Sequence, residues 1–317
     1  MTDPIPTGAI TPLHHTPPEL SYPGLSPQLL ARTKQLWSAR GLDFDPAWRG
    51  GIRALPGFCA VPRVANVTDS AAVDLVFLYD QALLWVRALH AATAAAYSRS
   101  IEGMSVAQWH CLAGVTARLT EQMTALRLLS LTGLPMPAMQ IARSLSEDVD
   151  TALVLLIRPK LAQRFADCRT AEDANAFWRR HIAGGRAFKA ISEKLYSVGI
   201  DHSADTDYAK WRRSVLTILS TAVHSNLVNP LTGSTDRDTA LVNDDSLYFA
   251  TFRVHEFCAY AQLVTPGLTD LLDSAGKAAP DSFAQLAAPL SAILINQIPS
   301  LTAPSHEPKR QRRTSAN

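Results

Sequence analysis

The sequence predicts an all-α fold, a multi-helix bundle of long antiparallel helices with disordered N- and C-terminal tails. Hydrophobic residues make up 47% of the 317 residues and aromatic residues only 7%, while Ala and Leu recur throughout. The alternation of β-branched and polar residues that marks strands is hard to find. Long apolar-rich stretches instead lie between N-capping residues and Gly or Pro, which is typical of helices.

The residues before position 69 are expected to lie outside the bundle. Residues 1–25 contain six prolines and few large apolar groups, so they bury too little surface to offset the entropy of ordering. We expect a disordered arm there. Ser26 and Pro27 predict the start of a helix that ends before Gly41. The Gly- and Pro-rich remainder of residues 26–68 predicts an irregular connector.

The bundle domain is expected over residues 69–298. The first long helix runs for about eight turns from Asp69 towards Gly103. Ser105 predicts the N-cap of the next helix, which Gly133 ends. A third long helix follows Pro137.

The second half of the bundle follows from similar signals. Pro159 disturbs the third helix, and Thr170 and Asp173 predict a capping box. Further helices are predicted over residues 186–198, from about 206 to 224, from 245 to a break at 266–267, and over 280–298. Residues 299–317 predict a basic disordered tail.

The charge of the chain argues against a dedicated binder of duplex nucleic acid. The formal net charge is +2, and the last dozen residues alone contribute +3. The body is therefore close to neutral and lacks the global field of such a binder. Two basic clusters on predicted helices would be local binding patches, but such clusters on helices are more often solvated faces, and we interpret them so. They comprise Arg179, Arg180, Arg186 and Lys189, and Lys210, Arg212 and Arg213.

Several classes of protein lack their signature in this sequence. Glu-x-x-His, His-Glu-x-x-His, the Walker loop and the Gly-x-Ser-x-Gly elbow are absent, so we expect no metal and no cofactor. The four cysteines form no Cys-x-x-Cys, which favours a reducing compartment. No secretory signal is apparent, and the densest apolar run, residues 152–157, is too short to span a bilayer. These observations predict a cytoplasmic protein without a membrane partner.

Arg143 and Glu147 are the first candidate functional pair. They lie four residues apart in an otherwise apolar helix, so an ion pair between them is geometrically easy, and Asp150 falls on a related face. One interpretation is an intrahelical salt bridge at the helix surface. The other is an anion-binding Arg143, held in place by Glu147, because the guanidinium fork suits oxyanions and phosphates.

Ser220 and His224 are the second candidate pair, again four residues apart on an apolar helix. His224 falls near the predicted C-terminus of this helix, where the helix dipole favours the imidazolium. It would act as an acid or base, or pack as a hydrogen-bonded structural histidine. Ser220 could equally bond a carbonyl one turn back on its own helix. His255–Glu256, His110 and His181 are weaker candidates.

The run GLPMPAMQIARSLSEDVDTALVLLIRPKLAQRFADC resembles the central helix of a widespread bacterial all-helical family of unknown function. That family joins an Arg-x-x-x-Glu helix to a later Ser-x-x-x-His ending, which LSTAVHSN resembles. The resemblance covers roughly residues 70–265. It implies that Arg143, Glu147, Ser220 and His224 form the functional set.

The layout is more distantly similar to HEPN-type helical domains, which occur in bacterial toxin–antitoxin and phage-defence ribonucleases. Their signature is an Arg, then four to six residues, then a His on one helix, and this spacing does not occur here. A shared mechanism would therefore require Arg143 and His224 to meet across two helices.

Two functional hypotheses follow. In the first, the chain is a non-catalytic helical interaction module in bacterial defence or stress response, with a protein partner or a second copy of itself. The four candidate residues would then form a buried network that fixes helix register. In the alternative, the chain is a metal-independent endoribonuclease that binds RNA. His224 would move a proton and Arg143 would stabilise the phosphorane. Side chains that converge in an open cleft would favour catalysis, and a sealed network would favour structure.

Overall fold

The computed structural model describes residues 17–61, 70–203, 205–223 and 245–301. These ranges contain helices and connecting turns and no strand, so the predicted all-α helical bundle is confirmed. The α-helices are α1 (Pro18–Ser21), α2 (Pro27–Ser38), α3 (Phe44–Gly50), α4 (Ser70–Arg99), α5 (Val106–Leu131), α6 (Pro135–Ile157), α7 (Pro159–Ala166), α8 (Ala171–His181), α9 (Arg186–Tyr196), α10 (Asp207–Thr221), α11 (Asp245–Val264), α12 (Leu268–Ala278) and α13 (Ala287–Leu301). Short 3₁₀ helices cover Ile52–Ala54 and Ser282–Leu286.

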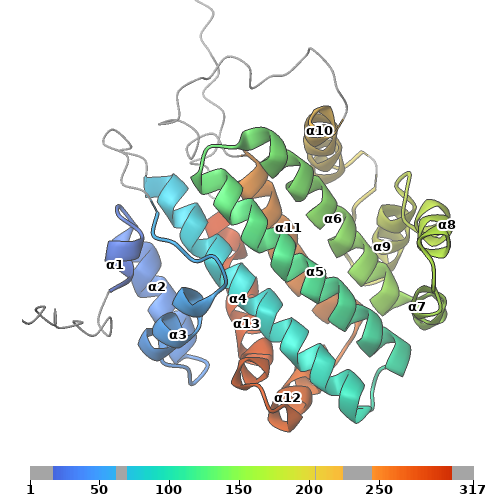
Figure 1. Ribbon diagram of the computed structural model, residues 1–317, viewed down its shortest axis with the longest axis horizontal. Coiled ribbons are helices and arrows are strands. Elements are labelled where there is room, and N and C mark those ends of the chain that lie inside the picture. The colour runs from blue at the N-terminus through green and yellow to red at the C-terminus, as the bar shows by residue number, and fades with distance from the viewer. Residues whose placement is uncertain (1–16, 62–69, 204, 224–244, 302–317) are drawn as a thin grey trace, which may run out of the picture.

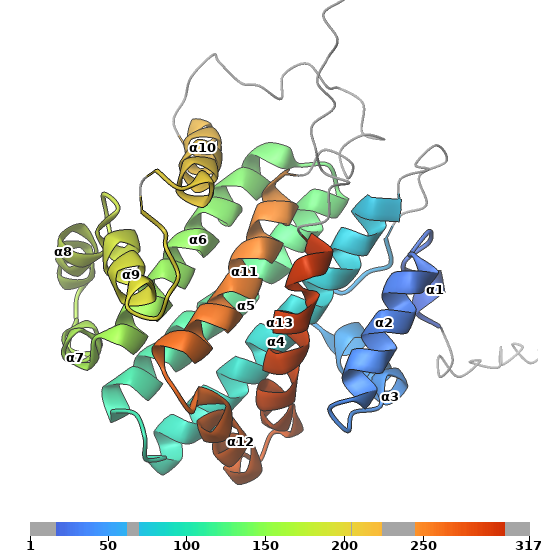
Figure 2. The ribbon, with the colours of Figure 1, turned by 180° about the vertical axis from the view of Figure 1, so that it is seen from behind.

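The long helices form two layers. Helix α4 packs on α5 and α5 on α6, and Figure 1 shows these three helices side by side. Helices α11 and α13 cover the other face of this layer, where α11 contacts α6 and α13 contacts α4 (Figure 2). Helices α7 to α10 flank the α6 edge, whereas α1 to α3 lie at the α4 edge. Of the candidate residues, Arg143, Glu147 and Ser220 belong to the α6 edge.

Helices α4 and α6 are central because apolar residues surround most of their circumference. The segment of α4 from Val76 to Val86 is buried without interruption, and so is that of α6 from Asp148 to Leu156. Any polar group in these segments is enclosed on all sides. Such groups need internal partners, since an unpaired buried polar group is costly.

The predicted helix caps are confirmed. The Ser105 hydroxyl accepts from the backbone N–H of Gln108 at 3.2 Å, and the Gln108 side chain accepts from the Ser105 backbone at 3.1 Å. Thr170 and Asp173 form the second capping box, with both bonds at 3.1 Å. Helix α6 ends at Ile157, two residues before Pro159, which cannot continue the helix because it lacks an N–H.

The prediction that all of residues 1–25 form a disordered arm is wrong for residues 17–25. Helix α1 lies in this range, and Tyr22 is completely buried. The Tyr22 hydroxyl donates to Asp80 on α4 at 2.6 Å, and its ring packs against Trp48 and Phe77. These long-range contacts offset the ordering entropy that the proline content suggested would prevail. Residues 1–16 lie outside the described residues.

Two other boundaries also differ from expectation. The predicted connector contains α3, whose Asp43 N-cap accepts from the Asp45 N–H at 3.0 Å and whose Trp48 is buried. The tail was expected to begin at residue 299, but α13 continues to Leu301, which is 2% exposed. In both cases a buried apolar side chain holds the backbone in a helix. Residues 62–69 and 302–317 lie outside the described residues.

The four cysteines of the chain are all unpaired. Among the described helices, none combines the length and the apolar character that crossing a membrane requires.

Candidate functional site

Arg143 and Glu147 form the ion pair that their spacing predicts. Arg143 Nε lies 3.5 Å from Glu147 Oε1, one turn further along α6. The two side chains are 31% and 37% exposed. The pair is therefore at the surface of the bundle, and the network expected to be buried at these positions is open to solvent.

Ser220 on α10 joins this pair. Arg143 Nη1 donates a hydrogen bond to the Ser220 hydroxyl, which brings together two motifs that lie 77 residues apart. The same hydroxyl donates to the Leu216 carbonyl at 2.6 Å, as predicted from its helical position. Because its single proton is used there, Ser220 acts towards Arg143 as an acceptor. His224, the fourth candidate, lies outside the described residues.

Helices α6 and α10 contact each other at two points. Arg143 meets Ser220, and seven residues later on α6 Asp150 meets Arg212, which precedes Ser220 by eight residues. Seven helical residues span about 10 Å. The two contacts therefore mark the ends of one interhelical seam.

A cavity of about 660 Å³ opens along this seam between α6, α9 and α10. This volume falls within the usual range of small-molecule sites, about 300 to 1,000 Å³. Its charged and aromatic lining residues are Arg143, Glu147, Asp150, Trp178, Phe188, Lys189, Glu193, His202, Arg212 and Arg213. Trp178 of α8 is 40% exposed, so the cavity communicates with solvent.

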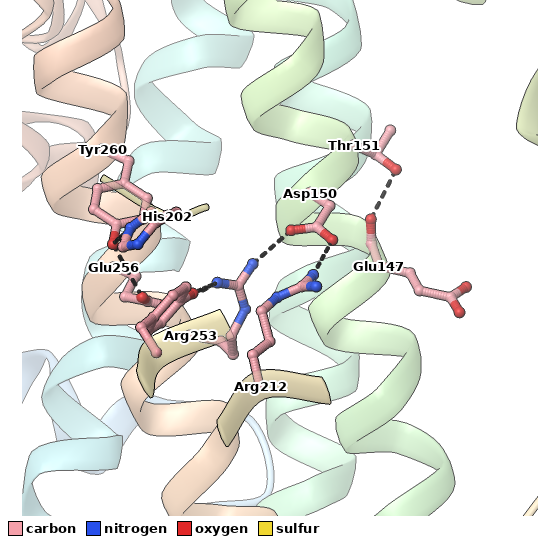
Figure 3. Close-up of polar contacts among 9 residues, drawn as sticks. Glu147, Asp150, Thr151, His202, Arg212, Arg253, Glu256 and Tyr260 are labelled. Carbon is pink, nitrogen blue, oxygen red and sulfur yellow. Dashed lines mark hydrogen bonds and ion pairs between the residues drawn. The ribbon is translucent and has the colours of Figure 1, made fainter. Parts of the chain in front are cut away.

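Asp150 and Arg212 line the cavity and belong to a buried ion network that the sequence did not predict (Figure 3). Asp150 of α6 bonds Arg212 of α10 and, at 2.6 Å, Arg253 of α11. Arg253 in turn pairs with Glu256 at 2.5 Å. All four side chains are at most 10% exposed. One carboxylate thus connects three helices.

This network corrects the interpretation of Arg212 as part of a solvated face. Arg212 is only 7% exposed, and its guanidinium also lies 4.3 Å from the centre of the Phe188 ring. Arg213, the next residue along, is exposed at the cavity. The spacing of Arg253 and Glu256 within an apolar helix was a signal that could have indicated the network.

His202 connects the ion network to the inner wall of the cavity. Its Nε2 lies 2.5 Å from the Tyr260 hydroxyl, which donates to Glu256 at 3.2 Å. The ring also packs against Tyr208, with ring centres 4.1 Å apart. Burial lowers the pKa of His202 and raises that of Tyr260. The histidine is therefore neutral at neutral pH.

Glu147 does not belong to this network. Figure 3 shows its carboxylate extending away from the contacts between Asp150 and the two arginines. The structure thus separates two groups of polar residues on α6. Arg143 and Glu147 are partly exposed and meet Ser220, while Asp150 is buried in the ion network.

A second buried polar cluster lies far from the cavity, at the α4 edge. Arg127 of α5 forms a bidentate pair with Asp80, at 2.6 and 2.9 Å, and donates to the Cys59 carbonyl at 2.9 Å. Tyr22 completes the cluster through Asp80. Because its bonds join α5 and the N-terminal segment to α4, we assign it a structural role.

The weaker histidine candidates lie apart from the cavity. His255 is buried within α11 and bonds the Thr251 carbonyl at 2.8 Å, and His110 stacks on Tyr97. His181 packs against Phe177 on α8. In the part of the chain that the structure describes, no three His, Cys, Asp or Glu side chains are arranged to hold a metal ion.

The geometry therefore offers an oriented arginine at an open cavity with a polar, partly aromatic lining. Comparison of the chain with protein-family models, with characterised proteins and with solved structures found no match. The proposed resemblance to a bacterial helical family thus stays a prediction.

Proposed function

We propose that this chain is a non-catalytic helical recognition module whose cavity binds an anionic group of its ligand on Arg143. The observation that carries this proposal is the restraint of Arg143 by Glu147 and Ser220 at the cavity. A guanidinium has five N–H donors, and the hydrogen bond to Ser220 uses one of them. The other donors stay available to a ligand, in a side chain that Ser220 and the ion pair with Glu147 already orient.

The charge of the lining supports an anion. The cavity lining has four basic side chains, Arg143, Lys189, Arg212 and Arg213, and three carboxylates, Glu147, Asp150 and Glu193. Asp150 is already bonded to two arginines. A buried, neutralised carboxylate repels an anion weakly. Arginine also suits planar or tetrahedral oxyanions better than lysine, because its fork can bind two oxygens at once.

Binding without catalysis agrees with the state of Ser220. A serine nucleophile needs an adjacent base that accepts its proton. The Ser220 proton is instead bonded to the Leu216 carbonyl, and among the described residues no carboxylate or imidazole bonds its hydroxyl.

Isothermal titration calorimetry with inorganic phosphate tests the proposal. We expect wild type to bind phosphate and Arg143→Gln to bind at least tenfold more weakly, about 1.4 kcal/mol. Arg49→Gln is the matched control, because Arg49 is exposed on α3 and remote from the cavity lining. Equal phosphate affinity in wild type and Arg143→Gln would overturn the proposal.

A second candidate, the metal-independent endoribonuclease, is favoured by one specific observation. Arg143 meets the Ser-x-x-x-His motif through Ser220, and that motif supplies His224 four residues later in sequence. His224 would take the proton of a ribose 2′-hydroxyl as its oxygen attacks phosphorus and the bond to the 5′-oxygen breaks. Arg143 would stabilise the added charge.

RNA cleavage by this route has a clear signature. It would persist in EDTA, leave 2′,3′-cyclic phosphate ends, and disappear in His224→Ala and Arg143→Ala while circular dichroism still shows a folded protein. Intact RNA after incubation with folded wild type would exclude the second candidate for that RNA. The cytoplasmic location, the role in bacterial defence and the protein partner or homo-oligomer stay predictions.

A further inference from the structure

We propose that a basic face formed by α7 and α8 binds single-stranded nucleic acid. The face comprises Arg158, Lys160, Arg164, Arg179 and Arg180, all of which are exposed. None of these five side chains lines the cavity between α6, α9 and α10. The inference therefore goes beyond the proposed function and does not depend on Arg143.

Positive charge is concentrated in this part of the chain. Residues 158–189 contain eight basic and three acidic residues, a net charge of +5, while the whole chain carries only +2. All other residues together therefore carry −3. A local excess of this kind creates a positive potential over one part of the surface, although the protein as a whole is close to neutral.

Tertiary packing joins the two helices that carry the basic face. Figure 1 and Figure 2 both show α7 beside α8. The centre of the Phe165 ring on α7 lies 4.9 Å from that of Phe177 on α8, which lies 5.0 Å from that of His181. Lys160 and Arg164 are four residues apart on α7, so they share one side of this helix.

Arginines from both helices act on one imidazole. Burial lowers the pKa of His181, and the positive charges of Arg180, Arg164 and Arg158 lower it further. The sequence indicated a solvated basic cluster on α8 alone. It did not show that the arginines at α7 lie close to this cluster, because that depends on how the two helices pack.

The charges of the basic face are not neutralised within the fold. Among the described residues, no carboxylate forms an ion pair with any of the five side chains. Exposed lysines elsewhere do have such partners, since Lys34 Nζ lies 3.1 Å from Asp45 and Lys277 Nζ 2.5 Å from Asp273. An anionic partner would relieve the repulsion between the unpaired cations.

The composition of the face favours phosphate groups as the anions. Four of the five cations are arginines. The planar guanidinium binds two phosphate oxygens at once, which the point charge of a lysine does not. A nucleic acid strand presents such groups at regular intervals, so several arginines can bind one molecule.

Trp178 distinguishes a nucleic acid from other polyanions. It is 40% exposed and is the one large hydrophobic side chain exposed within residues 158–189, all of which the structure describes. It precedes His181 by three residues on α8, so the two are neighbours on the helix surface. Exposed aromatic rings beside cations stack on the bases of single strands. A duplex hides its base faces, and a membrane surface calls for several exposed apolar side chains.

Fluorescence anisotropy of a labelled oligouridylate of about 20 nucleotides, titrated with the full-length protein, tests the inference. We expect the double variant Arg164→Gln/Arg180→Gln to bind at least tenfold more weakly than wild type. The logarithm of affinity should fall with the logarithm of salt concentration, and the slope should decrease by about 1.4 in the double variant, about 0.7 for each lost phosphate contact.

Arg40→Gln/Arg49→Gln is the matched control. It removes the same charge from two exposed arginines at α2 and α3, on the opposite edge of the bundle. We expect it to retain the oligonucleotide affinity of wild type within about twofold. Circular dichroism should show that both double variants are folded, because all four side chains are exposed. Equal affinity of wild type and Arg164→Gln/Arg180→Gln would overturn the inference, and so would absence of oligonucleotide binding by wild type.

Substitutions of Trp178 separate base stacking from attraction of charge. Trp178→Leu should weaken oligouridylate binding about tenfold, whereas Trp178→Phe, which keeps an aromatic ring, should retain most of the affinity. Inorganic polyphosphate has no bases, so its affinity should be the same in all three proteins. An equal loss for both probes, or no loss for oligouridylate, would contradict recognition of a nucleic acid.

Further probes compare other classes of partner with the single strand. The duplex of oligouridylate with oligoadenylate, polyglutamate, and vesicles of phosphatidylcholine with phosphatidylserine should all bind more weakly than oligouridylate at the same salt concentration. Tighter binding of any of them would overturn the inference in favour of that partner. Arg143→Gln should bind oligouridylate like wild type, so the proposed function can fail while this inference stands. Loss of oligouridylate binding in Arg143→Gln but not in Arg164→Gln/Arg180→Gln would overturn it.

Discussion

Asp150 of α6 and Arg253 of α11 form an ion pair of 2.6 Å across 103 residues of sequence. Asp150 also bonds Arg212, so a single carboxylate holds α6, α10 and α11 in register. Because α6 and α10 form two walls of the cavity, this network positions the proposed binding site. The stability of the network and the geometry of the site are therefore linked.

Removal of the Asp150 charge should strongly destabilise the fold. In Asp150→Asn two buried arginines lose their shared carboxylate, and breaking a buried pair typically costs about 3 to 5 kcal/mol. We expect a loss of this size in the free energy of unfolding, measured by urea denaturation. A change below about 1 kcal/mol would show that the network does not hold the helices.

Asp148 supplies a matched control two residues away. It pairs with Arg118 at 2.9 Å, but burial raises its pKa to about 6, so its charged form is disfavoured in the fold. Asp148→Asn at pH 7 should leave the free energy of unfolding unchanged or raise it. The contrast between the two neighbouring substitutions isolates the effect of the network from that of a lost carboxylate.

The N-terminal segment should contribute to stability through Tyr22. Its hydroxyl donates to Asp80, and a hydrogen bond to a charged group contributes about 1.5 to 3 kcal/mol. Tyr22→Phe should lower the free energy of unfolding by this amount in urea denaturation. Tyr196→Phe, at a side chain that is 71% exposed, should change it by less than about 0.5 kcal/mol. Equal effects of the two would contradict the role of Tyr22.

His255 should make the fold sensitive to acid. Burial lowers its pKa to about 4, while an unfolded histidine titrates near 6.5. Between these values the unfolded state binds a proton that the folded state does not, so the contribution of His255 is present above 6.5 and falls as the pH drops.

The difference in unfolding free energy between wild type and His255→Asn measures this contribution. When the pH falls from 7 to 5, wild type should lose about 2 kcal/mol of unfolding free energy relative to His255→Asn. The loss should approach about 1.4 kcal/mol per pH unit. Use of the difference cancels titrations that both proteins share. A constant difference over this range would show that His255 titrates alike in the folded and unfolded states.

Local signals explain which parts of the fold were predictable. The caps at Ser105 and Thr170 depend on residues three positions apart, so the sequence alone identifies them. The order of residues 17–25 depends instead on Tyr22 meeting Asp80, 58 positions away. Proline content describes only the local cost of ordering, and this distant contact offsets it.

In the candidate site, too, the contacts within one helix were predictable and those between helices were not. Helical spacing predicts the pair of Arg143 and Glu147, and their polarity within apolar sequence marks them as candidates. The contact with Ser220 depends on how α6 and α10 align, which periodicity does not encode. The burial of Arg212 likewise arises from its tertiary partners Asp150 and Phe188. A basic residue on an amphipathic helix otherwise suggests a solvated face.

The central claim, that an anion binds on Arg143 in the cavity between α6, α9 and α10, can be observed at the residue itself. Arginine Nε–H signals in a ¹⁵N-labelled protein report each guanidinium, and Arg143→Gln assigns the signal of interest by its loss. Titration with inorganic phosphate should shift the Arg143 signal along a saturable curve and leave that of Arg49 in place. A stationary Arg143 signal at phosphate concentrations that move other arginines would contradict the account.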